Sequence, residues 1–203
     1  MARTHGWSGH PPRDEEDARR RIVEAAGACI ERHGLAKTSM SDIATEAGVT
    51  RRTLYRYFAN LDELILEWGE AATREFAVRL VRHVRRIEDP SAILLEAVCF
   101  AIEQLPKSPY ANDLVSSGRP DLLLSGLTAD RAIVAGRAFL DELFPDPAAM
   151  FPGRDLDDVV EMMLRTIASM LGNPSDRPRT KRELRRFVGS WLLPALGLTA
   201  PPA

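Results

Sequence analysis

The chain of 203 residues has little cysteine and no long apolar run. No stretch of about 18 apolar residues occurs, so the sequence excludes a membrane-spanning helix. The first 20 residues lack the apolar segment that secretory signals carry, and we expect no signal peptide. The two cysteines, Cys29 and Cys99, fit no disulfide or metal-site spacing. These absences favour a protein of the reducing cytoplasm.

The sequence also lacks the short motifs of enzymes and metal sites. None of its four histidines stands in a spaced cluster with a cysteine or in a His-Glu-x-x-His pair. There is no glycine-rich phosphate loop and no nucleophile elbow. The acids Asp157, Asp158 and Glu161 are better explained as a solvated helix face than as a general acid–base pair. We therefore expect no catalytic residue, no metal and no cofactor.

The formal net charge is only −2, whereas a strongly basic balance is usual in proteins that bind nucleic acid. The charges are unevenly distributed, however. Residues 1–60 hold 10 Arg or Lys against 8 Asp or Glu, and residues 61–203 hold 17 against 21. The net charge of the whole chain therefore averages a small basic part with a larger acidic part. It does not exclude DNA binding by the basic part.

The periodicity of apolar residues predicts an all-α protein, because the long segments repeat every 3.6 residues and no alternating strand is convincing. The first helix is expected over 14–33, with Gly34 ending it. The fourth is expected to begin at Asn60, with Glu63 as its capping partner, and to continue for about 27 residues. About nine helices are expected in all, and the later ones span 91–105, 110–116, 120–124, 128–144, 155–172 and 180–196.

Two short helices are expected around Gly48, over about 41–47 and 50–58. Glycine suits the positive φ that a tight turn requires. Ala44 lies four residues before it and is small enough to let the helices approach, while Leu54 lies six residues after it. This spacing is that of a DNA-binding helix-turn-helix.

The second helix of this pair presents an unusual outer face. At about 100° per residue, Leu54 and Phe58 face the partner helices, while Arg52 and Arg56 point away from them. Residues 50–58 contain three Arg and no acid. Arginine can form bidentate hydrogen bonds with guanine edges in the major groove. A lone basic helix would be interpreted as a solvated face, but the turn, the hairpin and the acid-free face together favour DNA binding.

Residues 38–58, with the helix before them, closely resemble the tetracycline-repressor (TetR) family of bacterial regulators. The resemblance covers about 50 residues, and the remaining part is similar only in size and all-helical layout. The matching positions are Thr38, Ile43, Ala44, Ala47, Gly48, Val49, Thr50, Leu54, Tyr55, Tyr57 and Phe58.

The resemblance implies roles for individual residues. Arg51 and Arg52 would contact bases, and Arg56 could add a further contact. Leu61 stands where many members carry a phosphate-contacting lysine, and Arg56 could compensate for that loss. The residues expected to hold phosphates or to touch the DNA backbone are Ser39, Ser41, Thr50, Thr53 and Tyr55.

Three parts are therefore expected along the chain. Residues 1–15 show no periodicity and are expected to be a disordered arm, whose Arg3 and Arg13 could reach a minor groove, although a tail without contacts is the simpler interpretation. Residues 16–60 should form the three-helix DNA-binding domain, and residues 61–198 a larger helical domain for effector binding and dimerisation.

Dimerisation is expected because a single helix-turn-helix has a small contact area and usually occupies one of two half-sites. In the TetR family the last two helices pack against those of a second copy. The apolar stripes of these helices could also be intrachain core. The residues expected at the interface are Val159, Met163, Ile167, Leu184, Phe187, Val188 and Trp191.

An effector pocket would lie between helices and be lined by apolar and aromatic side chains. Each candidate could instead belong to the ordinary core. Few charged residues interrupt these stripes, which favours a hydrophobic or lipid-like effector. The candidate wall residues are Trp68, Phe76, Cys99, Phe100, Phe139, Met162 and Met170.

These observations together predict a ligand-responsive transcriptional regulator, in the first place a repressor. Its expected partners are double-stranded operator DNA of palindromic sequence, a second copy of the chain and a small effector, all in the bacterial cytoplasm and at the nucleoid when bound. Effector binding would shift the fourth helix and change the separation of the two recognition helices. An activator, a regulator controlled by a protein partner and a small helical enzyme are the alternatives.

Overall fold

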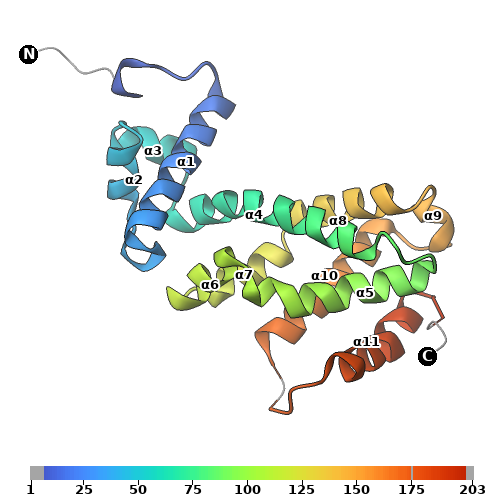
Figure 1. Cartoon of the computed structure of the whole chain (residues 1–203). Coiled ribbons are helices and arrows are strands. Elements are labelled where there is room, and N and C mark those ends of the chain that lie inside the picture. Colours follow the sequence, from blue (N-terminus) through green and yellow to red (C-terminus); the bar gives the residue numbers. More distant parts are fainter. Residues whose placement is uncertain (1–6, 175, 200–203) are drawn as a thin grey trace, which may run out of the picture. The chain divides into compact units, whose positions relative to one another are not determined.

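The computed structural model describes residues 7–174 and 176–199, and all regular structure in these residues is helical (Figure 1). The predicted all-α fold class is confirmed. Three short 3-10 helices occur at Trp7–Gly9, Leu35–Lys37 and Leu105–Lys107. The eleven α-helices are α1 (Glu15–His33), α2 (Met40–Glu46), α3 (Arg51–Tyr57), α4 (Leu61–Val84), α5 (Pro90–Gln104), α6 (Pro109–Ser116), α7 (Pro120–Leu127), α8 (Asp130–Leu143), α9 (Pro147–Met150), α10 (Leu156–Gly172) and α11 (Lys181–Ala195).

Most expected helix boundaries lie within two residues of the observed ones. The exceptions are α4, which ends three residues early, α7, which ends three residues late, and α9, which was not expected. This single turn of helix forms where the prolines predicted a break. Asp146 accepts the backbone N–H of Ala149, and Pro147 takes a first-turn position, where a missing N–H costs no helical hydrogen bond.

Capping residues fix where the helices begin. The side chain of Asp14 accepts the backbone N–H of Asp17 at 2.7 Å at the start of α1. At α4, Asn60 accepts the N–H of Glu63 at 2.9 Å, as the sequence predicts. The Glu63 carboxylate, however, accepts the N–H of Ala59, one residue before the position expected for a capping box.

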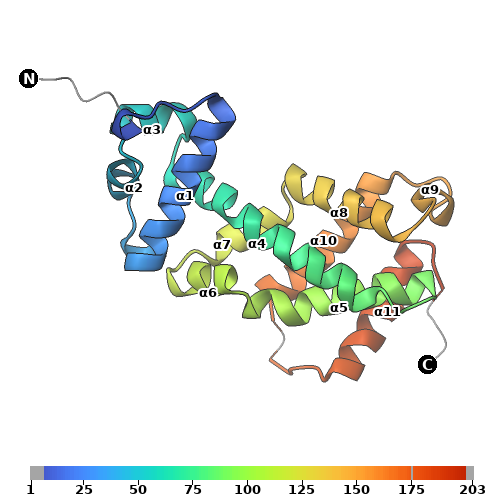
Figure 2. The same ribbon diagram turned by 45° about the horizontal axis from the view of Figure 1, so that its top comes forward.

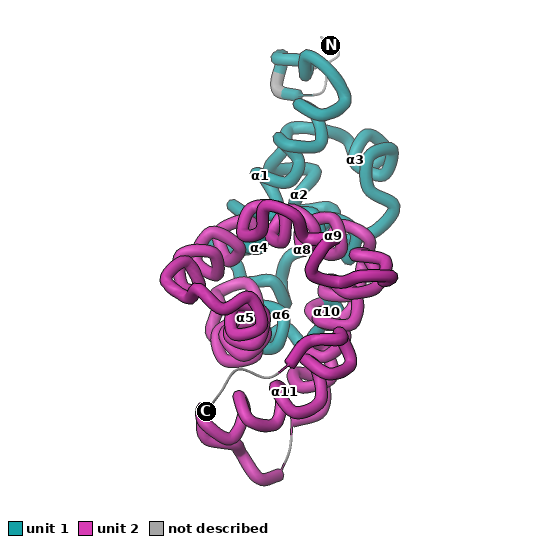
Figure 3. Tube along the Cα trace, turned by 90° about the vertical axis from the view of Figure 1, so that its right-hand side faces the viewer, with its two compact units in different colours: residues 1–73, 112–122 teal, residues 74–111, 123–203 magenta. Residues whose placement is uncertain are grey.

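The described residues fall into two compact units, drawn in teal and magenta in Figure 3. Unit 1 comprises the described residues up to Thr73 together with Asn112–Leu122, and unit 2 comprises Arg74–Ala111 and the rest. The first half of α4 therefore groups with the N-terminal helices, beyond the boundary expected at residue 60. Helix α4 begins in unit 1 and ends in unit 2 without interruption.

Unit 1 has an apolar core in which α1, α2, α3 and the start of α4 meet (Figure 2). Ile22, Ile43, Leu54, Phe58 and Leu64 are all fully buried in this core. Burying side chains of this size stabilises a fold by about 1.5–3 kcal/mol each. The same residues hold the helix-turn-helix on α1.

Residues 7–14, the described part of the expected arm, pack on unit 1. The backbone N–H of Trp7 donates to the carbonyl of Gly48 at 2.6 Å, and Arg21 of α1 donates to the carbonyl of His10 at 2.9 Å. The half-buried Trp7 packs against the core of unit 1 and gives this segment an apolar contact, which the composition of the segment did not reveal. Arg3 lies outside the described residues.

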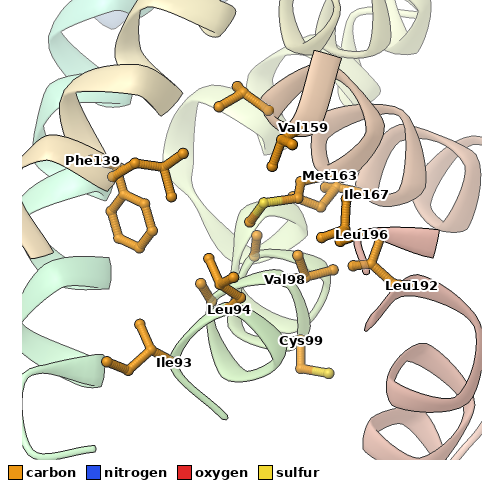
Figure 4. Close-up of a cluster of buried hydrophobic side chains, with 14 of the residues drawn as sticks. Ile93, Leu94, Val98, Cys99, Phe139, Val159, Met163, Ile167, Leu192 and Leu196 are labelled. Atoms are coloured by element: carbon orange, nitrogen blue, oxygen red, sulfur yellow. The ribbon is translucent and has the colours of Figure 1, made fainter. Parts of the chain in front are cut away.

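Unit 2 is built around α5, which packs against α10 and α11, while α8 packs on α10. Figure 4 shows apolar side chains of α5, α8, α10 and α11 meeting in one cluster. Beside it, Arg185 of α11 donates to the carboxylates of Glu96 and Glu103 on α5. Burial opposes ionisation of Glu96, but the hydrogen bonds from Arg185 and His83 outweigh it and lower the pKa of this carboxyl group.

Both cysteines are free and buried. Burial raises the pKa of the Cys99 thiol to about 12. Among the described helices, none is long and apolar enough to cross a membrane. Within residues 7–174 and 176–199, no group of three His, Cys, Asp or Glu side chains is placed to hold a metal ion.

Candidate nucleic-acid interface

Helices α2 and α3 and the turn between them form the hairpin predicted from the sequence. The turn is centred on Gly48, whose φ of 65° lies in the left-handed region. Its N–H donates to the carbonyl of Thr45, and the next N–H, of Val49, donates to the carbonyl of Ala44 at 2.9 Å. Thr50 then caps α3 by accepting the N–H of Thr53 at 3.1 Å. The turn is therefore closed by local hydrogen bonds at both ends.

The predicted inner face of α3 is confirmed. Leu54 and Phe58 are fully buried against α1 and α2, where they meet Ile43 and Ala44. A seven-residue helix is too short to be stable alone in water. Its orientation is therefore set by this apolar contact and by the groups that bind its two ends.

The outer face of α3 carries cations that are free to bind a ligand. Arg51 and Arg52 are both exposed, and within the described part of the chain neither forms an ion pair or a hydrogen bond. Tyr55 is 45% exposed beside them. No acidic residue stands on α3. Two unpaired guanidinium groups on an exposed helix match the donors that read guanine in the major groove.

Arg56, for which the sequence predicted a possible further DNA contact, is held by its neighbour Tyr57. One of its guanidinium nitrogens donates to the hydroxyl oxygen of Tyr57 at 2.7 Å, and the group lies 4.8 Å from the centre of the Tyr57 ring. A base or phosphate contact by Arg56 must therefore compete with this contact.

The five expected backbone-contacting residues lie at the starts of α2 and α3 or on the outer side of α3. Ser39 caps α2, and its hydroxyl also donates to the Asp42 carboxylate at 2.6 Å. Ser41 is exposed in the first turn of α2. The hydroxyl oxygens of Thr50 and Thr53 are 2.9 Å apart, so one donates to the other. Their contacts with DNA remain predictions.

Leu61 is half-buried and packs against the core of unit 1. Its apolar side chain has no ammonium group that could bind a phosphate. In this chain the side chain contributes to packing at the start of α4, so no phosphate contact is expected from it.

Arg19 of α1 holds the end of α3, and the sequence reasoning missed this role. Its guanidinium donates to the carbonyl of Tyr57, the last residue of α3, at 2.6 Å. It also lies 4.3 Å from the centre of the Phe58 ring and pairs with Glu67 of α4. Arg19 falls on the same helical face as Ile22, and a cation inside an apolar stripe was the available signal.

Five of the seven candidate pocket residues lie in or beside the core of unit 2, and the other two do not. Trp68 belongs to unit 1, where its indole nitrogen lies 3.0 Å from the position that a Cβ on Gly27 would take. Met162 is 46% exposed. Phe76, Cys99 and Phe139 are buried in the core of unit 2, with Phe100 and Met170 packed beside it.

A surface groove of about 550 Å³ is present elsewhere in unit 2, near the start of α11. None of the seven candidate pocket residues lines it. Its lining is cationic and partly aromatic, and consists of Arg177, Pro178, Arg179, Glu183, Arg186, Phe187 and Ser190.

Five of the seven expected interface residues are buried in the core of unit 2. Each of them is at most 8% exposed. Apolar periodicity selects the stripe of a helix that faces the core, and these residues belong to that stripe. Phe187 and Trp191 of α11 are 37% and 71% exposed. The five buried residues are Val159, Met163, Ile167, Leu184 and Val188.

Comparisons with known proteins point to one family. Residues 22–68, which include α2 and α3, match the sequence profile of the family described as bacterial regulatory proteins, tetR family. The chain is 26% identical over 185 residues to an uncharacterized HTH-type transcriptional regulator of Mycobacterium tuberculosis (strain H37Rv), covering 90% of this chain and 87% of the relative.

Two further similarities agree with this match. The chain is 35% identical over 75 residues to the HTH-type nicotine-responsive transcriptional repressor HdnoR of Paenarthrobacter nicotinovorans, covering 37% of each protein. Among solved structures, the TetR-family transcriptional repressor QsdR of R. erythropolis has a TM-score of 0.64. That similarity covers 93% of this chain and 98% of the other at 19% identity, and so concerns the fold alone.

Proposed function

We propose that this chain is a repressor of the TetR family of bacterial transcriptional regulators, that it binds a palindromic operator as a homodimer, and that a small hydrophobic effector releases it. The observation that carries the proposal is the outer face of α3, where three arginines and no acid stand on a helix whose other face is buried. The family is one of DNA-binding regulators and not of enzymes.

In this proposal Arg51 and Arg52 read base edges, because their guanidinium groups are exposed and unpaired in the described structure. Arg56 contributes less, since its guanidinium is held on Tyr57. Phosphates are bound by the hydroxyl groups around the two helix starts. These are Ser39, Ser41, Thr50, Thr53 and Tyr55.

The homodimer is proposed to form through the exposed side of α11. Phe187 and Trp191 are four residues apart and therefore lie on one face of this helix. Exposed aromatic side chains are enriched at protein interfaces. A second copy would cover both and would set the spacing of two recognition helices, about 34–36 Å for half-sites one DNA turn apart.

The effector is proposed to bind among the apolar side chains of unit 2. Trp68 and Met162 are left out of this proposed site. The wall residues that remain lie in or beside the core of unit 2 and are Phe76, Cys99, Phe100, Phe139 and Met170. Helix α4 runs without interruption from unit 1 into unit 2. A shift of α4 would therefore displace the helices that α4 contacts in unit 1. Repression by HdnoR, a nicotine-responsive repressor, supports a ligand-responsive role. The site of action would be the chromosome in the bacterial cytoplasm.

Selection of binding sites from random double-stranded DNA tests this proposal. We expect the selected sequences to contain two inverted half-sites, and we expect affinity to fall steeply with salt, by about 0.9 in log–log slope per phosphate contact. DNA in which one half-site is scrambled is the matched control and should bind much more weakly. Selection of no sequence, or affinity that is insensitive to salt, would contradict DNA reading by α3.

A further inference from the structure

Residues 7–14 cross from the start of α1 to the helix-turn-helix, and they are called the strap here. At one end the backbone N–H of Arg13 donates to the carboxylate of Asp17 on α1 at 3.1 Å. In the middle, Arg21 of α1 binds the carbonyl of His10. At the other end Trp7 contacts the α2–α3 hairpin. Figures 1 and 2 both show the strap returning from α1 to this hairpin.

Trp7 contacts both the turn before α3 and the last residue of α3, in ways that local sequence does not require. Its N–H donates at 2.6 Å to Gly48, in the turn before α3. Its ring meets that of Tyr57, the last residue of α3, edge to face, with 6.2 Å between centres and planes inclined by 78°.

The backbone of Trp7 is itself strained. Its φ is 71°, and among the described residues it is the one residue other than glycine with positive φ. A bulky residue adopts this conformation only when surrounding contacts outweigh its cost. The contacts with Gly48 and Tyr57 are therefore strong enough to hold Trp7 in place, and strain of this kind often accompanies a functional constraint.

We propose that the strap sets the orientation of α3 and that Trp7 is a positioning residue for sequence-specific DNA reading. The proposal rests on α3 reading the operator, as proposed above. Base contacts require the side chains of α3 to be held to within about 0.5 Å. A seven-residue helix has few contacts of its own, and Trp7 binds both the turn that precedes α3 and the last residue of α3. Trp7 acts through Gly48 and Tyr57 and does not contact the bases.

Full-length Trp7→Ala, Trp7→Phe and His10→Ala test this role. Affinity for the selected operator and for unrelated DNA is measured by fluorescence anisotropy at several salt concentrations. Loss of an aromatic pair predicts that Trp7→Ala raises the operator Kd by about tenfold. Its Kd for unrelated DNA and its salt slope should stay unchanged, because the phosphate contacts remain. Trp7→Phe keeps a ring edge and should restore most of the affinity.

His10→Ala is the matched control, because it shortens a side chain of the strap and keeps the backbone carbonyl that Arg21 binds. It should bind like the parent chain. Thermal unfolding establishes that each variant is folded, and Trp7→Leu, which keeps apolar bulk without an aromatic edge, replaces the alanine variant if that one is unfolded. A double-mutant cycle of the Trp7 variant with Tyr57→Leu should show coupling, since each change removes the same contact.

Three outcomes overturn the proposal: an unchanged operator Kd in Trp7→Ala, an equal loss of operator and unrelated DNA binding, or additive effects in the cycle. An equal loss would mean that Trp7 only stabilises the domain. Failure of the parent chain to prefer any DNA sequence is a different result, because it rejects DNA reading by α3 before any variant is compared.

Discussion

Arg19 of α1 donates a hydrogen bond to the carbonyl oxygen of Tyr57, and this bond joins the first helix of the chain to the last residue of α3 at 2.6 Å. The same guanidinium pairs with Glu67 on α4 and lies 3.6 Å from the carboxylate of Glu63. The backbone carbonyls at the end of a helix have no partner within that helix. Arg19 therefore satisfies such a group at the end of α3 and connects it to α4.

Replacing Arg19 by Gln should destabilise unit 1 by about 1–2 kcal/mol, because a charged hydrogen bond is lost and the pair with Glu67 is partly screened by solvent. Urea unfolding followed by circular dichroism measures the change. Arg165→Gln is the control, since its pair with Glu161 is an exposed contact within one helix, worth about 0.5 kcal/mol or less. Equal losses of unfolding free energy in the two variants would show that the bond from Arg19 to α3 contributes no more to stability than an exposed ion pair.

Arg52 and Arg56 should differ in their effect on operator binding, although both stand on the outer side of α3. Arg52→Ala should cost about 1–3 kcal/mol on the selected operator and relax the preference at one base pair. Arg56→Ala should cost less, because its guanidinium is already held on Tyr57. Competition binding with single-base variants of the operator measures both. Equal loss of specificity in the two variants would contradict the distinction.

The helix-turn-helix could be predicted from the sequence because its determinants are local. The glycine of the turn, the alanine four residues before it and the capping residues Thr50 and Asn60 act within a few residues of themselves. Apolar periodicity was enough to place Leu54 and Phe58 inside. The fold class and most helix boundaries follow from the same short-range signals.

Contacts between distant residues could not be predicted in this way. Arg19 meets Tyr57 across 38 positions, and the strap contact of Trp7 depends on the tertiary arrangement of α1 and α3. Periodicity also does not separate residues of the intrachain core from residues that a partner could reach. It selects the inward stripe of a helix, so Val188 proved to be core while Trp191, on the other side of α11, is exposed.

Asp17 should make the stability of unit 1 decrease at low pH. The N–H of Arg13 lowers its pKa from 3.8 to about 2, against the effect of burial and with help from Arg20 and Arg21. Because the folded-state pKa lies below that of the unfolded chain, its contribution is complete above about pH 4 and is lost as pH falls towards 2. Asp17→Asn should flatten this part of the curve of unfolding free energy against pH. An unchanged curve would show that other carboxylates cause the acid sensitivity.

Trp191→Glu should shift the protein from dimer towards monomer, because a carboxylate would be buried at the proposed interface without a partner. Analytical ultracentrifugation at several concentrations measures the equilibrium. Val115→Glu is the control, since Val115 is 58% exposed on α6 and outside the proposed interface. A dimer that is unaffected by Trp191→Glu would place the interface elsewhere.

Gly136→Ala should destabilise unit 2, because an added Cβ would overlap Cγ1 of Val160, where α8 packs on α10. Val160 is buried and β-branched, so its side chain cannot rotate away easily. Overpacking of this kind costs about 1–3 kcal/mol, which exceeds the gain of up to about 1 kcal/mol that alanine brings to a helix.

Gly189→Ala on α11 is the matched control for this crossing, since its added Cβ would lie 3.4 Å from Leu95, close to ordinary contact. It should be neutral or slightly stabilising in urea unfolding, because alanine favours the helix. Val160→Ala should suppress the effect of Gly136→Ala when the two are combined, since the clashing methyl group is removed. Additive destabilisation in the double variant would contradict the close crossing of α8 and α10.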